Sequence, residues 1–294
     1  MDLYARPNQD PSRPCMVTAA LSGVVANRAQ CPAIPYTPEE YAAEARRAYE
    51  AGAAAVHIHA RTPEGAPSFE IEDYRNIRDA IVAECPVIIN FSTGALDVSV
   101  EKRLAYLHAV KPAVAALNMG SMNYAKYNAK KKGFVFDFVF QNPFSEIRAL
   151  LEGMNAAGIK PECECFDAGH VGSLYPLIDM GVLQPPFQVS LIMGVIGGVP
   201  GTVAQLMRQV ELLPPDSDWE LIALSLDQWR LLAAAAAIGG NVRVGLEDNF
   251  YVAPGEMAKS NGDLVAKAVR MVRDQGRPVA TVEQCRERLG LRHP

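Results

Sequence analysis

Two histidines placed one residue apart are the residues in this sequence most able to do chemistry. His57 and His59 end the apolar run AAAVHIHA (53–60), just before Pro63 and Gly65 break the pattern. In a strand, residues two apart point to the same side, so the two imidazoles face the same way. Imidazoles inside an apolar strand need polar partners, because an unpaired polar group in a low-dielectric site is costly. The pair predicts divalent-metal ligation, with a buried polar network as the alternative.

Two histidines leave a divalent ion short of ligands, and the segment VRVGLEDN (242–249) offers carboxylates for the same site. If this segment is a strand, Arg243 and Glu247 share one face, and Asp248 follows at its end. Two imidazoles and one carboxylate leave an open coordination position, which is typical of catalytic rather than structural zinc. His170, which follows another expected strand, is a second possible ligand.

The elements that must position these residues alternate between short apolar runs and helical patterns. Continuous apolar runs are typical of parallel strands that are buried on both faces. Strands are expected at 16–23, 53–60, 86–93, 113–121, 159–167, 187–194, 219–225 and 241–249. Helices are expected at 38–51, 70–83, 98–109, 144–157, 170–180, 202–212, 228–238, 262–275 and 281–289. The run GFVFDFVF (133–140) is interpreted as part of an inserted hairpin.

Eight βα units in one chain predict a single-domain TIM (β/α)8 barrel of the α/β class. The alternative is a doubly wound fold, but no GxGxxG motif follows the first expected strand. In a barrel, the C-terminal ends of the strands meet at one mouth, where enzymes of this fold keep their catalytic residues. We expect residues 1–15 to form a loose N-terminal arm and residues 16–294 to form the catalytic domain.

The composition is that of an ordinary globular protein, with 49% hydrophobic and 21% charged residues and a net charge of −5. No segment clusters Lys or Arg among aromatic residues, so neither a nucleic-acid partner nor a membrane surface is indicated. The six cysteines form no CxxC pair, which argues against a zinc ribbon or a disulfide framework. With no signal-peptide pattern and no apolar run of about 18 residues, we expect a cytoplasmic location.

Several motifs, taken in order, give the chain a family resemblance. They are VTAALSG, VHIHAR, INFSTG, LNMGSMN, FVFQN, PECECFDAGH and VRVGLEDN, and together they span nearly the whole chain. The sequence resembles the β-keto acid cleavage enzymes. That resemblance implies a zinc-dependent barrel that condenses a β-keto acid with acetyl-CoA and yields acetoacetate and a new acyl-CoA.

The resemblance also implies roles for individual residues. It implies zinc ligation by His57, His59 and Glu247, and a catalytic pair formed by Arg243 and Asp248. A β-keto acid can bind a Lewis acid through its ketone and carboxylate oxygens, which makes its C2 proton easier to remove. A base beside it, by resemblance Asp248, would take that proton.

Further roles follow from the resemblance in the loops and strand ends. Ser92 of INFSTG is expected to be catalytic, as is an acid of the PECE strand, either Glu162 or Glu164. An ion pair with one of these acids is the alternative role of Arg243. Substrate-binding groups, which include backbone N–H groups for a developing oxyanion, are expected at Thr93, Gly94, Asn118, Gly120, Ser121 and Asn27.

One segment departs from the family pattern and bears on the substrate. Family members that act on an amino substrate carry a glutamate soon after the glycine of the first strand, whereas SGVVANRAQ (22–30) contains no acid. An ammonium group would lack its counter-charge here. We predict a β-keto acid with a neutral or apolar tail, or an anionic tail if Arg28 points inward.

Three other kinds of protein share parts of this pattern. Hydrolases of the amidohydrolase kind carry HxH on the first barrel strand and need further histidines, and CoA-type lyases carry it late in the barrel. A non-enzymatic binding barrel would hold no metal. The aromatic-rich excursion 122–145 predicts a homodimer or homotetramer, because a monomer rarely tolerates so much exposed apolar surface.

Overall fold

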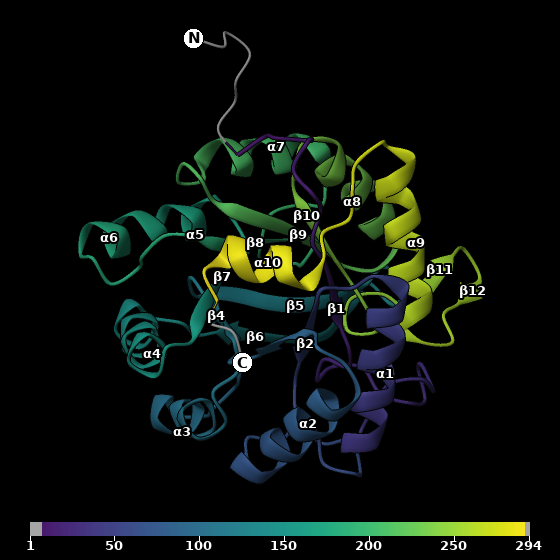
Figure 1. Ribbon diagram of the computed structural model, residues 1–294, viewed down its shortest axis with the longest axis horizontal. Helices are drawn as coiled ribbons and strands as arrows, with labels where there is room; N and C mark the ends of the chain where they lie inside the picture. The colour runs from purple at the N-terminus through teal and green to yellow at the C-terminus, as the bar shows by residue number, and fades with distance from the viewer. Residues whose placement is uncertain (1–7, 292–294) are drawn as a thin grey trace, which may run out of the picture.

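A computed structural model describes residues 8–291, in which eight parallel strands close into a barrel (Figure 1). Around the barrel the strands follow the order β1-β10-β9-β8-β7-β4-β3-β2. This confirms the TIM barrel and excludes the doubly wound alternative. The barrel strands are β1 (Val17–Ala20), β2 (Ala55–Ile58), β3 (Ile88–Phe91), β4 (Val114–Asn118), β7 (Lys160–Cys165), β8 (Gln188–Met193), β9 (Asp218–Ala223) and β10 (Asn241–Val244).

Most helices form the outer layer around these strands, whereas α10 lies across one end of the barrel (Figure 1). Their bounds are α1 (Pro38–Ala51), α2 (Ile71–Glu84), α3 (Val100–Val110), α4 (Phe144–Ala157), α5 (Ala168–Gly172), α6 (Leu174–Asp179), α7 (Val203–Leu212), α8 (Gln228–Ala237, after the short 3₁₀ helix Ser225–Asp227), α9 (Asn261–Asp274) and α10 (Val282–Leu289). The single helix expected at 170–180 is wrong in one respect, since two short helices stand there. Pro176 has no N–H to donate back to Gly172, so one continuous helix would lose a hydrogen bond at that point.

Local sequence signals account for where the first helix begins and ends. The Thr37 hydroxyl accepts from the Glu40 N–H, and the Glu40 carboxylate accepts from the Thr37 N–H at 3.0 Å. This is the reciprocal capping that TPEE predicts. Gly52 ends the helix with φ 109°, in the left-handed region that glycine adopts without strain.

A hairpin inserted between β4 and β7 covers part of the barrel mouth. It consists of β5 (Met122–Asn128) and β6 (Gly133–Phe140), as the aromatic run predicted. Ala125 forms an isolated bridge with Ile196 in the loop after β8. In the same loop Gly197 has φ 103°, and a Cβ there would run into the Asn123 carbonyl group. The hairpin is therefore docked closely against the β8–α7 loop.

Each barrel strand turns one row of side chains to the helices and the other to the lumen. The helix-facing row is apolar and forms the main core. The lumen is unusually polar for a buried space, so its side chains must pair with one another. The buried polar lumen residues are Thr18, His57, Asn90, Glu162, Glu164, Ser190, Glu220 and Arg243.

The opposite, N-terminal end of the barrel is closed by the two ends of the described chain. Trp219 Nε1 donates to the Asn8 carbonyl, and Arg13 pairs with Asp218. Arg288 of α10 also binds Asp218, at 2.7 Å. Residues 8–15 of the expected arm thus lie against the barrel, and residues 1–7 fall outside the described part.

Two further features complete the fold. A small hairpin that the sequence patterns did not predict follows β10 and pairs β11 (Tyr251–Ala253) with β12 (Glu256–Met257). Within residues 8–291, no helix combines the length and the apolar character needed to cross a membrane.

Candidate active site

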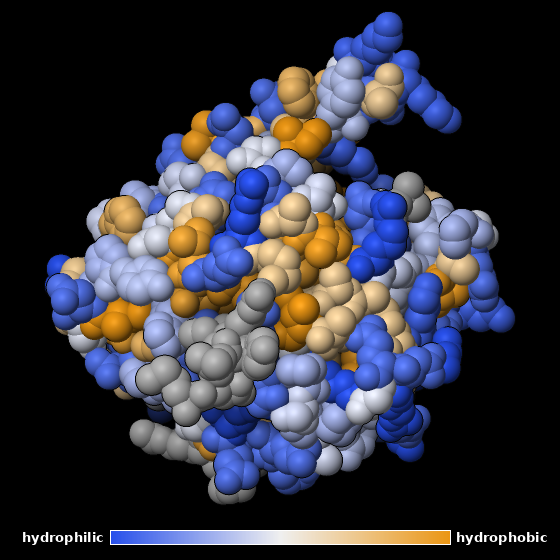
Figure 2. Space-filling model, turned by 90° about the horizontal axis from the view of Figure 1, so that it is seen from above, coloured by the Kyte–Doolittle hydropathy of each residue, from blue (hydrophilic) through white to orange (hydrophobic). Residues whose placement is uncertain are grey.

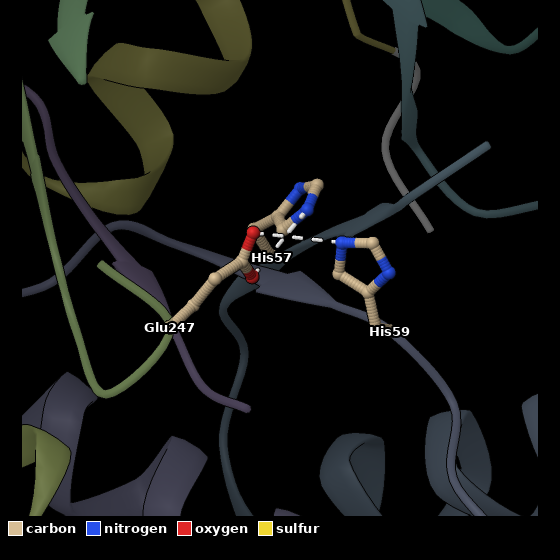
Figure 3. A group of neighbouring side chains, drawn as sticks. All are labelled: His57, His59 and Glu247. Atoms are coloured by element: carbon tan, nitrogen blue, oxygen red, sulfur yellow. Dashed lines mark ion pairs between the residues drawn. The ribbon is translucent and has the colours of Figure 1, made fainter. Parts of the chain in front are cut away.

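His57, His59 and Glu247 meet at the C-terminal mouth of the barrel (Figure 3). One nitrogen or oxygen atom from each lies within 4.8 Å of the others. Glu247 Oε2 is 3.8 Å from His57 Nε2, and Glu247 Oε1 is 3.5 Å from His59 Nε2. Both rings turn toward the carboxylate, as Figure 3 shows. The structure thus brings together the three residues expected to be metal ligands.

Glu247 reaches this place for a different reason from the one the sequence suggested. The expected strand to residue 249 is wrong, because β10 ends at Val244 and a turn follows. Gly245 has φ 140°, and its carbonyl accepts from the N–H groups of Asp248 and Asn249 at 3.0 Å. The turn, rather than strand alternation, carries Glu247 back over the lumen.

Glycine at position 23 is needed beside this turn. Gly23 has φ 55°, and a Cβ on it would lie 2.7 Å from Glu247 Cγ. Real Cβ atoms do not approach that closely, so the loop after β1 packs directly against the Glu247 side chain. Sequence analysis did not identify Gly23 as a site residue.

Arg243 joins the cluster of His57, His59 and Glu247 to the acids beside it. Its guanidinium donates to both oxygens of Asp248 at 3.0 Å and to Glu247 Oε1 at 2.7 Å. Its Nη1 lies 3.6 Å from Glu164 Oε1. A planar guanidinium suits such two-point contact with a carboxylate. The expected Arg243–Asp248 pair is present, and so is the ion pair that was its alternative.

Burial and Arg243 together set the charge states in the cluster. Burial alone would raise the pKa of Glu247, but the charges of Arg243 and both histidines hold that pKa well below its usual range. Burial raises the pKa of Asp248 to about 6, against the pull of Arg243. Burial, reinforced by a neighbouring carboxylate, raises the pKa of Glu164 to about 8. Burial, with the charge of Arg243, also lowers the pKa of His57 well below 6.5, which favours the neutral imidazole.

The three-residue cluster fits a divalent cation in its donor chemistry. It offers a neutral imidazole and an ionised carboxylate, and Glu247 Oε2 is a buried atom without a hydrogen-bond partner in the described part of the chain. Buried polar atoms are normally paired. Two histidines with one carboxylate are a common ligand set of catalytic zinc.

The two candidate acids of the PECE strand occupy different layers. Glu164 lies at the mouth and faces Arg243. Glu162 lies one layer deeper, where it binds Asn90 and Ser190 and is fully buried. Glu164 therefore lies beside Arg243 at the mouth, whereas Glu162 lies in the layer below and contacts Asn90 and Ser190.

The INFSTG loop presents Ser92 and Gly94 beside Asn118. Ser92 Oγ accepts from the Gly94 N–H at 3.1 Å. A Cβ at Gly94 would lie 3.5 Å from both Ser92 Oγ and Asn118 Nδ2, so these groups share one small space. The Thr93 hydroxyl is used elsewhere, since it donates to the Ala116 carbonyl at 2.5 Å.

Two predicted substrate-binding residues, Gly120 and Ser121, lie beside His170. A Cβ on Gly120 would collide with the His170 ring. Ser121 is exposed, and its hydroxyl accepts from the Asn142 N–H at 2.7 Å. His170 Nδ1 accepts from the Phe166 N–H at 3.2 Å, and its Nε2 lies 3.4 Å from the Ser121 carbonyl oxygen. His170 is a buried structural residue outside the cluster of His57, His59 and Glu247.

The loop after β1 holds the residues expected to meet the substrate tail. Asn27 is exposed, and its Oδ1 accepts from the Ala29 N–H at 3.0 Å. Arg28 lies over the Tyr36 ring, 4.1 Å from its centroid, and pairs with Glu40. Arg28 is thus occupied at the start of α1, away from any inward role.

Arg61 fixes this loop and was not identified from the sequence. Its guanidinium is buried and donates at 2.6 to 3.2 Å to four backbone carbonyls, those of Ser22, Gly23, Ala26 and Gly65. The only signal in the sequence was an arginine directly after HIHA. That signal is weak, because the four acceptors of Arg61 are backbone carbonyls, which every residue type carries.

Tyr124 of the inserted hairpin also belongs to the site. Burial, followed by the negative charges of Glu247 and Asp248, raises the pKa of its hydroxyl to about 12. Its ring stacks on Phe138 with centroids 5.4 Å apart and meets Phe166 edge-on. The hairpin therefore adds an aromatic wall to the polar mouth.

Comparison with known proteins gives a consistent family. A sequence model of the beta-keto acid cleavage enzyme family matches residues 14–291. The chain is 37% identical to a 3-keto-5-aminohexanoate cleavage enzyme of Acetoanaerobium sticklandii, over 94% of this chain and 98% of that enzyme. It is 33% identical to a 3,5-dioxohexanoate:acetyl-CoA acetone transferase of Paraburkholderia graminis, over 95% of this chain and 96% of that one.

A solved structure supports the fold. The apo structure of ObcA superposes with a TM-score of 0.74 at 22% identity, covering 88% of this chain. This chain spans 66% of the length of that longer protein, so the likeness concerns the barrel.

Proposed function

Because the chain belongs to the β-keto acid cleavage enzyme family, we propose that it transfers the acyl part of a β-keto acid to CoA with a zinc ion held by His57, His59 and Glu247. The co-substrate is acetyl-CoA, and the products are acetoacetate and a new acyl-CoA. The observation that carries the zinc site is the meeting of the three ligand atoms within 4.8 Å, beside the Arg243–Asp248 pair.

A divalent cation held by His57, His59 and Glu247 would act on the substrate as a Lewis acid. When bound there, a divalent ion would polarise the ketone of the β-keto acid and make its C2 protons more acidic. Zinc suits the donor set, since three protein ligands leave one position open. The remaining work falls to side chains of this chain.

Asp248 is the proposed base. It lies at hydrogen-bond distance from Arg243, which holds its carboxylate in one orientation, and its pKa of about 6 suits proton removal near neutral pH. It removes a proton from C2, and the carbanion attacks the thioester carbonyl of acetyl-CoA, which breaks the C–S bond. The freed CoA thiolate adds to the original ketone, and the bond between C2 and C3 then breaks. Acetoacetate leaves after its C2 regains the proton from Asp248.

Donor groups near the INFSTG loop support the charge that develops during these steps. Ser92 and Asn118 converge at Gly94, and both are buried. Preorganised donors in a water-poor site stabilise an oxyanion more strongly than water does. We assign this role to Ser92, Asn118 and the backbone N–H groups of 92–94.

The substrate tail is proposed to be neutral or apolar. The 22–30 loop carries no acid to meet an ammonium group, and Arg28 is already paired with Glu40. The aromatic wall at Tyr124 adds apolar surface to the mouth. Together these features favour a tail without charge over an anionic one.

A homodimer or homotetramer is proposed from the exposed apolar side chains. Phe134, Val135 and Val139 of the hairpin are 60%, 59% and 55% exposed. Figure 2, seen from the α7 side, shows apolar areas that reach the surface in a band between polar ones. Large exposed apolar patches favour contact with another chain. We also propose a division into an N-terminal segment (1–15) and a catalytic domain (16–294), and a cytoplasmic location.

A reconstitution assay tests the proposed metal site. Protein stripped with a chelator is supplied with acetyl-CoA and a neutral-tailed 3-oxo acid, and acetoacetate is measured before and after addition of Zn²⁺. We expect activity only after reloading, and none in His57→Asn. His108→Asn is the matched control, since His108 lies exposed on α3. Full activity in stripped protein or in His57→Asn would refute the site.

A further inference from the structure

A line of hydrogen bonds, here called the lumen line, crosses the barrel one layer below His57, His59 and Glu247. Asn90 Nδ2 donates to Glu162 Oε2, and Ser190 Oγ binds Glu162 Oε1. Ser190 Oγ also lies 3.1 Å from Glu220 Oε1, and Thr18 Oγ1 donates to Glu220 Oε2 at 2.8 Å. The five side chains come from β3, β7, β8, β9 and β1, and all are almost fully buried.

A count of hydrogens determines the direction of this line. The Ser190 hydroxyl has one hydrogen but lies against two carboxyl groups, so one carboxyl must supply a proton of its own. Burial and the charge of Glu162 raise the pKa of Glu220 well above its usual range. Glu220 is therefore the protonated acid and donates to Ser190, which in turn donates to Glu162.

The direction of the line fixes how the Asn90 amide is turned. Glu162 Oε2 is an acceptor, so Asn90 must present its NH2 group to it and keep Oδ1 for its other side. Asn90 Oδ1 is buried without a hydrogen-bond partner in the described structure. In the register of the two strands, Asn90 pairs with His57 of β2. His57 Nδ1 is likewise buried without a hydrogen-bond partner in the described structure. Burial lowers the pKa of His57 and the Asn90 side chain opposes that shift, so the two side chains are neighbours.

We propose that Asn90 is a positioning residue whose Oδ1 accepts the Nδ1–H of His57 and so fixes the tautomer of that imidazole. A neutral imidazole carries one N–H, so a hydrogen on Nδ1 leaves the Nε2 lone pair free. Nε2 is the atom that faces Glu247. The opposite tautomer would put a hydrogen where a cation must bind. The inference rests on the proposed metal site. In it, the lumen line orients the Asn90 amide, and Asn90 in turn keeps His57 Nε2 free for a cation.

The first test needs no substitution at Asn90. Protein labelled with ¹⁵N-histidine is stripped of metal, and long-range ¹H–¹⁵N correlation spectra distinguish protonated from unprotonated ring nitrogens. His57 is assigned by the signals that disappear in His57→Gln. We expect His57 to carry its hydrogen on Nδ1. A hydrogen on Nε2 in the wild-type protein would overturn the inference.

The second test measures Zn²⁺ affinity by competition with a chelator in two isosteric variants. Asn90→Leu removes the acceptor for His57, and loss of such a partner of a ligating histidine typically costs 10–100-fold in metal affinity. We expect that loss, together with a shift of His57 away from the Nδ1–H form. Glu220→Gln is the control, because glutamine supplies the same donor to Ser190 and the same acceptor to Thr18. We expect its affinity to stay within about 3-fold of wild type.

The outcomes separate this inference from the proposed function. Wild-type protein that binds no Zn²⁺ would remove the metal site itself. Wild-type protein that binds Zn²⁺, with equal affinity and an unchanged tautomer in Asn90→Leu, would leave the metal site standing and overturn the role of Asn90.

Discussion

At the scale of single residues, Arg243 is central to the site because its guanidinium lies beside three carboxylates. It contacts Glu247, Asp248 and Glu164, and the three have different protonation behaviour. The carboxylate of Glu247, nearest the histidines, stays ionised, while burial raises the pKa of Glu164 to about 8. The Arg243 guanidinium thus contacts both the proposed metal ligand Glu247 and the proposed base Asp248, which are adjacent in one turn.

Removal of the Asp248 charge should separate chemistry from metal binding. Asp248→Asn keeps the shape and one oxygen for Arg243 but cannot take a proton from C2. We expect kcat for acetoacetate formation to fall by about 10²–10⁴-fold, the usual contribution of a positioned base. Zn²⁺ content, measured on the same samples, should not change, because the three ligands are intact. A variant with kcat within 10-fold of wild type would show that another group is the base.

At the scale of elements, local signals and long-range contacts differ in how well the sequence reveals them. α4 lies where it was predicted, at 144–157, because Pro143 and Gly158 mark its two ends locally. The turn after β10 was missed, since an apolar run with period-two spacing does not reveal that Gly245 adopts φ 140°. The lumen line could not be predicted, because Asn90 and Glu162 are 72 residues apart and meet only when the barrel closes.

The hairpin and the β8–α7 loop provide a test of docking. Gly197→Ala introduces a Cβ into the Asn123 carbonyl group, and Gly194→Ala in the same loop has a similar positive φ, 87°, with open space around it. Both variants suffer backbone strain, but only the first suffers a clash. We expect Gly197→Ala to be less stable than Gly194→Ala by about 1–3 kcal/mol, as for other overpacked sites. Chemical denaturation measures this difference, and equal stabilities would contradict the observed close docking.

Glu220 on β9 should make the stability of the apo protein depend on pH. Its pKa is raised above 4.5 by burial, so over a range above that value the folded state holds a proton that the unfolded state has lost. Stability therefore falls as pH rises, from about the unfolded pKa up to the folded one. Relative to Glu220→Gln, which cannot titrate, we expect the wild type to lose up to about 1.4 kcal/mol per pH unit in this range. Urea denaturation at pH 5, 6 and 7 measures the slope, and parallel curves would show that Glu220 is ionised in the fold.

At the scale of the whole molecule, the barrel brings distant segments to one mouth. β2 supplies His57, the residue after its end supplies His59, the turn after β10 supplies Glu247, and the inserted hairpin supplies aromatic side chains. The barrel and the inserted hairpin followed from the periodicity of the sequence, and the trio of His57, His59 and Glu247 was expected from the motifs. The turn that carries Glu247 over the lumen required the structure. Substrate choice is therefore expected to depend on the loops that surround His57, His59 and Glu247.

The most direct measurement follows the carbon atoms of the reaction. Wild-type protein loaded with Zn²⁺ is incubated with [¹³C₂-acetyl]-CoA and a panel of unlabelled 3-oxo acids with neutral, cationic and anionic tails, and the products are identified by ¹³C NMR. We expect acetoacetate labelled at C3 and C4, an unlabelled acyl-CoA, and the highest rate with a neutral tail. Absence of acetoacetate with every acid, or label in the new acyl-CoA, would contradict the proposed reaction.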